Sequence, residues 1–253
     1  MILITNDDGI YAEGLLALAK ELGSIDELLI VAPFEEQSAV GHAITLSEPL
    51  RLRRVKLNED IFGWATSGRP ADAVKLGVKV LTKITPSLII SGINLGENVG
   101  ASLIYSGTVS AATEGTLLGI PSIAISIPFS RNPDYRPAAK FALHLARLVL
   151  ANGLPQGVLL NVNVPGLPLD KIKGVKVTRQ GKTYFADFFE ERIDPHGGKY
   201  YWMGGSVVSL EESEDTDFEA LSRGYISITP VHYDLTAYQF METLRSWNLK
   251  LPV

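Results

Sequence analysis

Two adjacent aspartates, Asp7 and Asp8, follow a short apolar stretch at the start of the chain, in the sequence MILITNDDGI. Two carboxylates about 4 Å apart repel each other by roughly 4 kcal/mol in a surface-like dielectric. A cation bound between them would remove this repulsion, and carboxylate oxygens are ligands that Mg²⁺, Mn²⁺ and Ca²⁺ prefer. The pair therefore predicts a cation site, although Asn, Asp and Gly also form ordinary turns between a strand and a helix.

Two more polar segments follow apolar stretches that are typical of strands. FEEQSAVGHA (34–43) contains Ser38, and GINLGENVG (92–100) contains Asn94 and Asn98. Ligands of open parallel sheets bind beyond the carboxyl ends of the strands. We therefore expect the two aspartates to share one divalent cation with Ser38 and Asn94, all four of which offer oxygen ligands.

A third segment, YSGTVSAATEG (105–115), predicts a complementary anion site. Small residues surround Gly107 and leave the backbone N–H groups of a helix start open, while Ser106 or Thr108 can cap it. Such a helix N-terminus attracts an oxyanion. Alone, the segment is better explained as an ordinary capped helix; beside a cation site, it indicates phosphate-ester chemistry.

Alternating strand and helix patterns surround these segments. Apolar runs predict strands at 2–5, 27–33, 87–92, 121–127 and 157–165, and helical periodicity predicts helices at 12–23, 70–81, 108–119 and 138–150. Strands that are apolar on both faces indicate a parallel sheet covered on both sides. The predicted fold class is α/β: a three-layer α/β/α sandwich with a mostly parallel, Rossmann-like sheet. Residues 43–57 predict a hairpin that turns at Glu48 and Pro49.

From residue 173 the pattern becomes rich in β-forming residues. We therefore predict an α/β catalytic core at 1–172, a β-rich C-terminal extension at 173–237, and a C-terminal helical segment at 238–253. Aromatic residues gather in the extension. They fit a core or an oligomer interface, with a base-stacking wall for a nucleotide as the alternative.

The composition limits the classes of molecule that the protein is expected to bind and the compartment in which it is expected to act. The 253 residues carry a formal net charge of −5, which does not favour binding a nucleic-acid polymer. The chain has no cysteine, which excludes thiolate chemistry and fits a reducing compartment. No stretch approaches the length of about 18 apolar residues that a membrane span needs, and the first residues do not form a signal peptide. We expect a cytoplasmic protein without a membrane partner.

Five motifs together resemble the SurE (survival protein E) family. They occur in family order over residues 1 to about 236: MILITNDDGI, VAPFEEQSAVGHAIT, SGINLGENVG, YSGTVSAATEG and ISITPVHYDLT. The resemblance implies a metal-dependent phosphatase acting on nucleoside monophosphates, with one Mg²⁺ or Mn²⁺ per subunit, which Ca²⁺ could replace in a crystal. It also implies a homodimer or homotetramer assembled through the β-rich part.

The resemblance places the metal ligands on Asp7, Asp8, Ser38 and Asn94. It places the phosphate-side loop on the segment Ser106, Gly107 and Thr108, with Asn98 nearby. One departure is SGRPADAV (67–74), where Arg69 stands at a position that the family more often gives to a small hydroxyl residue.

We therefore hypothesise hydrolysis of a phosphate monoester, with 5′-nucleotides as the main substrates and 3′-nucleotides as further ones. Asp8, or else Asp7, would position the attacking water, and an aspartyl-phosphate route stays open. His42 could serve as a general acid or could simply hold its loop. A non-catalytic sensor of nucleotides or cations is the alternative function, because binding and hydrolysis require the same residues.

Overall fold

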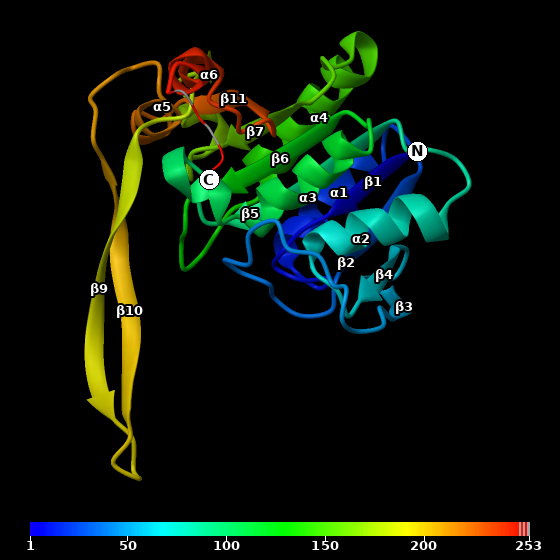
Figure 1. The fold of residues 1–253 in the computed structure, drawn as a ribbon. Coiled ribbons are helices and arrows are strands. Elements are labelled where there is room, and N and C mark those ends of the chain that lie inside the picture. The colour runs from blue at the N-terminus through cyan, green and yellow to red at the C-terminus, as the bar shows by residue number, and fades with distance from the viewer. Residues whose placement is uncertain (248, 250, 252–253) are drawn as a thin grey trace.

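The computed structural model describes residues 1–247, 249 and 251. Its centre is a nine-stranded sheet in the order β3-β4-β2-β1-β5-β6-β7-β11-β8 (Figure 1). In this spatial order, the six neighbouring strands that begin with β4 and end with β7 are all parallel to one another. They are β4 (Phe62–Thr66), β2 (Leu28–Pro33), β1 (Ile2–Thr5), β5 (Leu88–Leu95), β6 (Ser122–Ile127) and β7 (Val158–Asn163). This confirms the predicted mostly parallel sheet.

Helices cover both faces of the sheet, which gives three layers. Alternate residues of β1 point to opposite faces: Ile2 and Ile4 join the core under one pair of helices, and Leu3 joins the core under the other. The first pair is α1 (Glu13–Leu22) and α4 (Arg136–Asn152), and the second is α2 (Pro70–Leu76) and α3 (Gly107–Leu117). The uniformly apolar strands exist because both faces are buried.

The predicted hairpin at 43–57 is wrong in position. The structure forms β3 (Leu52–Lys56) antiparallel to β4, with the turn at 58–61, and assigns no strand to the segment 43–50. The turn is closed by Asn58, whose Oδ1 accepts hydrogen bonds from the N–H groups of Asp60 and Ile61. The hairpin therefore turns at this Asx turn and not at Glu48 and Pro49, because the Asn58 side chain satisfies the backbone N–H groups of the turn.

The predicted helix at 70–81 divides into two parts. The α-helix α2 ends at Leu76, and a π-helical turn, Gly77–Leu81, follows it. Short 3-10 helices, Gly100–Ile104 and Leu169–Lys171, occupy two of the loops. None of these details changes the layer order.

The C-terminal region is only partly an extension. Two of its strands, β11 (Ile226–His232) and β8 (Val175–Val177), join the central sheet, with β11 antiparallel to β7. The boundary predicted at residue 173 therefore does not separate two sheets. What extends from the body is one long hairpin, β9 (Thr183–Ile193) and β10 (Lys199–Ser209), which projects as an arm (Figure 1).

The base of this arm is fixed by a buried carboxylate. Asp217, at the start of α5 (Asp217–Ser222), is fully buried. Its two oxygens accept hydrogen bonds of 2.8–2.9 Å from the backbone N–H groups of Gly100, Gly181 and Phe218. Asp217 thus joins the arm to the loop after β5.

The last helix is α6 (Tyr238–Arg245), shorter than the helical stretch of 238–248 that its periodicity predicts. The end of the predicted segment 238–253 includes residues 248, 250, 252 and 253, which lie outside the described residues. Within the described part of the chain, no helix combines the length and apolar character needed to cross a membrane.

Candidate active site at the carboxyl edge of the sheet

Asp7 lies directly against the N-terminus of α3. Thr108 donates its hydroxyl hydrogen to Asp7 Oδ1. A Cβ atom added to Gly107 would lie 2.7 Å from Asp7 Cβ and 2.8 Å from Asp7 Oδ2, so only glycine leaves room for this carboxylate. The structure therefore brings the first predicted metal ligand and the predicted anion segment together.

This contact also changes the role of the helix start. The Thr108 backbone N–H and hydroxyl both favour the charged form of Asp7, and Ser106 Oγ accepts the N–H of Val109 at 3.1 Å. Donors that the sequence analysis assigned to a substrate phosphate are thus partly used by the protein itself. The positive end of α3 stabilises Asp7.

Asp8 points into an open cavity of about 400 Å³. Its Oδ2 accepts a hydrogen bond from Leu95 N–H at 3.3 Å. The cavity is lined by acidic, hydroxyl and aromatic side chains, including Glu36, Ser38, Phe129 and Tyr135. Asp8 therefore faces a space where a small polar ligand with an apolar part fits.

The acid pair is electrostatically strained. Burial raises the pKa of Asp7, against the opposing effect of the Thr108 donors. Burial, and then the charge of Asp7, raises the pKa of Asp8 to about 7. The charge of Glu36 acts in the same direction on both. Such a site favours binding either a proton or a cation.

The other two predicted ligands lie at the same edge of the sheet. Ser38 shares the cavity with Asp8 and donates a 2.5 Å hydrogen bond to Glu36 Oε1. Asn94 precedes the residue that binds Asp8, and it donates through Nδ2 to Gly96 O at 2.6 Å, which leaves its Oδ1 as an acceptor. Their joint coordination of a metal stays a prediction.

No three His, Cys, Asp or Glu side chains are grouped to hold a metal anywhere in the described residues. Two carboxylates alone bind a hard cation weakly, so a site here requires neutral oxygen ligands in addition. Ser38 and Asn94 are of that type. The donor chemistry fits Mg²⁺ or Mn²⁺ better than zinc.

Asn98 is held in a buried amide network. Its N–H donates to Asn163 Oδ1 at 2.8 Å, its carbonyl accepts from Asn161 and Asn163, and its Nδ2 donates to Ser126 Oγ at 2.9 Å. These bonds fix the loop between β5 and α3. Contact of Asn98 with substrate stays a prediction.

Three groups that bind predicted residues were not predicted from the sequence: Glu36, which binds Ser38, Leu95 N–H, which binds Asp8, and Glu114, which binds His42. Glu36 follows a strand end, and that position was a usable signal. Buried Glu114 binds His42 Nε2 at 3.0 Å and Lys75 Nζ at 2.5 Å. The neighbouring Gly41 N–H donates to Tyr105 O at 3.0 Å, just before α3 begins. These bonds hold the His42 loop against α3, and a role of His42 as a general acid stays a prediction.

Arg69 precedes α2, and its backbone N–H donates to Asp72 Oδ2 at 2.9 Å. Asp72 also accepts the N–H and hydroxyl of Thr45. Arg69 therefore preserves the capping arrangement at the N-terminus of α2. Nothing in these contacts requires the small hydroxyl that the family more often has there.

Comparisons with known proteins identify the family that this chain resembles. The family model described as "Survival protein SurE" matches residues 2–187. A protein of Syntrophobacter fumaroxidans named "5'-nucleotidase SurE" is 50% identical over 248 residues, covering 98% of this chain and 99% of its own length. One of the same name from Syntrophus aciditrophicus is 52% identical over 245 residues, covering 96% and 92%.

A solved structure shares the fold as well. The crystal structure of the SurE protein from Aquifex aeolicus has a TM-score of 0.84 and 42% sequence identity, covering 97% of this chain and 98% of that chain. Because the family model and these relatives span most or nearly all of the sequence, the chain belongs to the SurE family.

Proposed function

We propose that this chain is a divalent-metal-dependent phosphomonoesterase that hydrolyses nucleoside monophosphates to nucleoside and phosphate, as a 5′-nucleotidase with 3′-nucleotides as further substrates. The observation that carries the proposal is the Asp7–Asp8 pair, which combines raised pKa values with a cavity and a helix N-terminus. Relatives about half identical to the chain bear the name 5'-nucleotidase SurE. We place its action in the cytoplasm, because a chain without cysteine fits a reducing compartment.

We assign one Mg²⁺ or Mn²⁺ to Asp7, Asp8, Ser38 and Asn94, with Ca²⁺ as a replacement. The fit rests on the donor set and on the mutual repulsion of the carboxylates. When bound, such a cation supplies charge neutralisation and polarises a phosphoryl oxygen. Thr108 and the N-terminus of α3 keep Asp7 ionised and oriented for this task.

The remaining residues act on substrate and water. Asp8 is half-buried and lines the cavity, so its carboxylate can accept a proton from an attacking water. Ser106 and Gly107 lie at the start of α3, where Gly107 packs against Asp7. Together with Asn98, on the preceding loop, they are the proposed phosphate contacts. Phe129 and Tyr135 form the apolar wall of the cavity and fit the nucleoside. The aromatic residues of the hairpin belong to a projecting arm, not to this cavity.

The test is phosphate release from nucleoside 5′- and 3′-monophosphates by protein treated with EDTA and then given Mg²⁺, Mn²⁺ or Ca²⁺. We expect release only with a divalent cation, and a loss of at least about 1000-fold in kcat for Asp8→Asn. Asp60→Asn, an exposed aspartate elsewhere, is the matched control. Nucleotide binding without any phosphate release would instead support the non-catalytic sensor.

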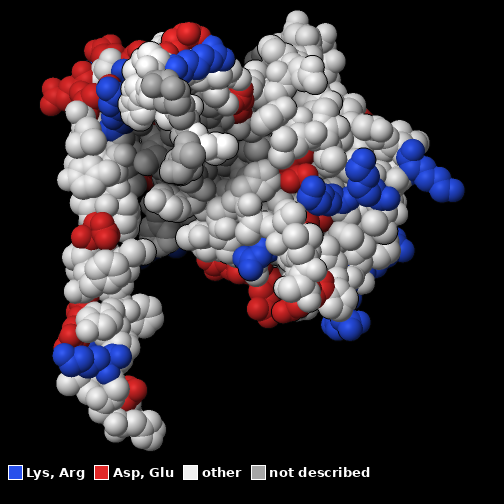
Figure 2. Space-filling model, viewed as in Figure 1, with Lys and Arg blue, Asp and Glu red and all other residues white. Residues whose placement is uncertain are grey.

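We also propose a homodimer or homotetramer assembled through the hairpin. Its exposed side chains include Phe188, Phe189 and Trp202, which are 61%, 63% and 59% exposed. The surface of the arm shows few charges along its middle (Figure 2). Exposed apolar surface of this kind marks an interaction site. Light scattering should give a multiple of 27.5 kDa that decreases in Phe188→Asp/Phe189→Asp; a monomeric wild type would overturn the proposal.

A further inference from the structure

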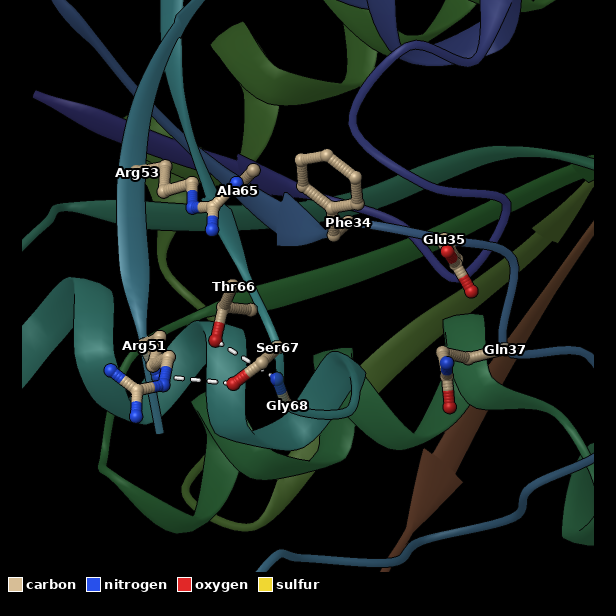
Figure 3. Close-up of a pocket in the computed structure, with 9 residues that line it drawn as sticks. All are labelled: Phe34, Glu35, Gln37, Arg51, Arg53, Ala65, Thr66, Ser67 and Gly68. Atoms are coloured by element: carbon tan, nitrogen blue, oxygen red, sulfur yellow. Dashed lines mark hydrogen bonds between the residues drawn. The ribbon is translucent and has the colours of Figure 1, made fainter. Parts of the chain in front are cut away.

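A second cavity, of about 350 Å³, opens at the carboxyl ends of β2 and β4 (Figure 3). Its lining comes from three segments: Arg51, just before β3, with Arg53 inside that strand; Thr66, at the end of β4, with Ser67 just after it; and Phe34 from the segment after β2. None of the residues so far assigned to catalysis lines it. Its chemistry therefore requires a separate explanation.

One stretch of backbone divides the two cavities. Phe34, Glu35 and Gln37 line this second cavity, whereas Glu36 and Ser38 line the cavity of Asp8. Two hydrogen bonds fix the stretch: Phe34 N–H donates to Thr66 O at 2.7 Å, and Gln37 N–H donates to Asp7 O at 2.8 Å. The second cavity thus adjoins the acid pair.

The charge of the second cavity is opposite to that of the acid pair. Two guanidinium groups stand against one carboxylate, that of Glu35. Neither Arg51 nor Arg53 forms an ion pair with any residue that the structure describes. Arg51 immediately precedes β3 and Arg53 is its second residue, and both line the same cavity.

Two hydroxyl groups in the lining accept hydrogen bonds from the backbone. Ser67 Oγ accepts the N–H of Arg51 at 3.0 Å, and Thr66 Oγ1 accepts the N–H of Gly68 at 3.0 Å (Figure 3). Within the described chain neither hydroxyl donates to another group. Thr66 is buried, whereas Ser67 is exposed, so the hydroxyl hydrogen of Ser67 is available to an incoming acceptor.

Two guanidiniums that form no ion pair within the described residues, together with the available hydroxyl hydrogen of Ser67, match the many acceptor oxygens of a phosphate dianion. Phe34, which is 45% exposed, adds an apolar surface beside them. We propose that this cavity, the Arg51–Arg53 pocket, binds a phosphate group. The group is either the second phosphate of a substrate whose first phosphate lies at the acid pair, or the phosphate of a separate anion. The first source rests on the proposed function; the second does not.

The test uses calorimetric titration of Asp8→Asn protein in EDTA, which prevents hydrolysis and metal-mediated binding. The probes are a nucleoside 3′,5′-bisphosphate, the matching 5′-monophosphate and inorganic phosphate. Each is titrated into three forms: the parent, Arg51→Gln/Arg53→Gln, and Arg54→Gln. Arg54 is the matched control because it belongs to the same strand but stacks on Phe62, 4.8 Å from the ring centroid.

We expect the double substitution to weaken binding of at least one phosphate probe by tenfold or more, and Arg54→Gln to change it less than twofold. A bisphosphate that binds more tightly than the monophosphate, with the advantage lost in the double variant, identifies a substrate phosphate. Inorganic phosphate with the same arginine dependence, and no bisphosphate advantage, identifies a separate anion. Equal binding of all probes by the parent and the double variant would overturn the pocket.

Kinetics in the otherwise wild-type chain separate this pocket from the proposed function. Arg51→Gln/Arg53→Gln should leave kcat for the monophosphate unchanged, which also shows that the variant is folded. If wild-type protein releases no phosphate while the arginine-dependent binding persists, the proposed hydrolysis fails and the pocket stands. Arg51→Lys/Arg53→Lys, which keeps charge but not the planar fork, should restore only part of the affinity.

Discussion

Thr108 donates its hydroxyl hydrogen to Asp7, although the two residues are 101 positions apart in the sequence. The bond connects the end of the first strand to the start of α3, so it couples the acid pair to the helix that faces it. Because Asp7 is 4% exposed, a donor lost here is not readily replaced by water.

Thr108→Val should therefore weaken metal binding, while Thr108→Ser should preserve it. Removing the hydroxyl destabilises the ionised form of Asp7, so its pKa rises further and a cation competes with a more tightly bound proton. We expect a loss of about tenfold in Mg²⁺ affinity, equivalent to about 1.4 kcal/mol, measured by calorimetry. Equal affinities for the Val and Ser variants would show that the hydroxyl does not support the acid pair.

Metal binding should depend on pH through Asp8. Its folded-state pKa is raised from 3.8 to about 7 by burial and by the charge of Asp7. In EDTA, the stability contributed by this group is complete below pH 3.8 and is lost as the pH rises through about 7. A bound cation must displace the proton, so added Mg²⁺ should raise Tm more at pH 8 than at pH 5.5.

Asp8→Asn supplies the control for this pH dependence. The variant cannot lose a proton at that position, so its Mg²⁺-induced change in Tm should be small at both pH values. A wild-type change in Tm that is the same at both pH values would show that Asp8 does not bind the cation.

Gly107→Ala should disturb the acid pair even though alanine favours helices. The new Cβ would lie 2.7 Å from Asp7 Cβ and 2.8 Å from its Oδ2, and the carboxylate would have to move. We expect a destabilisation of about 1–3 kcal/mol together with loss of Mg²⁺ binding. Gly166→Ala is the control, since no atom lies within 4 Å of its added Cβ; similar behaviour of the two variants would contradict the packing argument.

Asp217→Ala should destabilise the base of the arm. Three backbone N–H groups lose their acceptor in a buried position, and each unsatisfied group costs about 1–3 kcal/mol. Denaturant unfolding should show a loss of about 3 kcal/mol or more. Asp170→Ala, whose side chain is 75% exposed, should stay within about 0.5 kcal/mol of wild type.

The sequence predicted the sheet well because its central strands are buried on both faces. Runs such as ILIT and SLIISG have no polar alternation, and that pattern directly reflects helices on either side. The position of the acid pair followed from topology, since parallel strands expose their carboxyl ends at a single edge.

Features set by long-range contacts escaped prediction. β11 pairs with β7 only after more than sixty intervening residues, and its local sequence resembles that of an independent extension. The amide network of Asn98 and the contact of Glu114 with His42 depend on side chains brought together by the finished fold. Likewise, the start of α3 has an internal partner, Asp7, which the small residues around Gly107 cannot reveal.

The hairpin of β9 and β10 should be less stable than the central sheet in an isolated subunit. Leu210 N–H donates to Lys182 O at 2.8 Å, which closes the ribbon next to the body. Beyond that point, among the strands that the structure describes, β9 and β10 pair with each other alone. A ribbon of two strands is marginally stable without further partners. In an isolated subunit its amide hydrogens should exchange with solvent well before those of β1 or β5, so hydrogen exchange along the ribbon would directly report whether another subunit protects it.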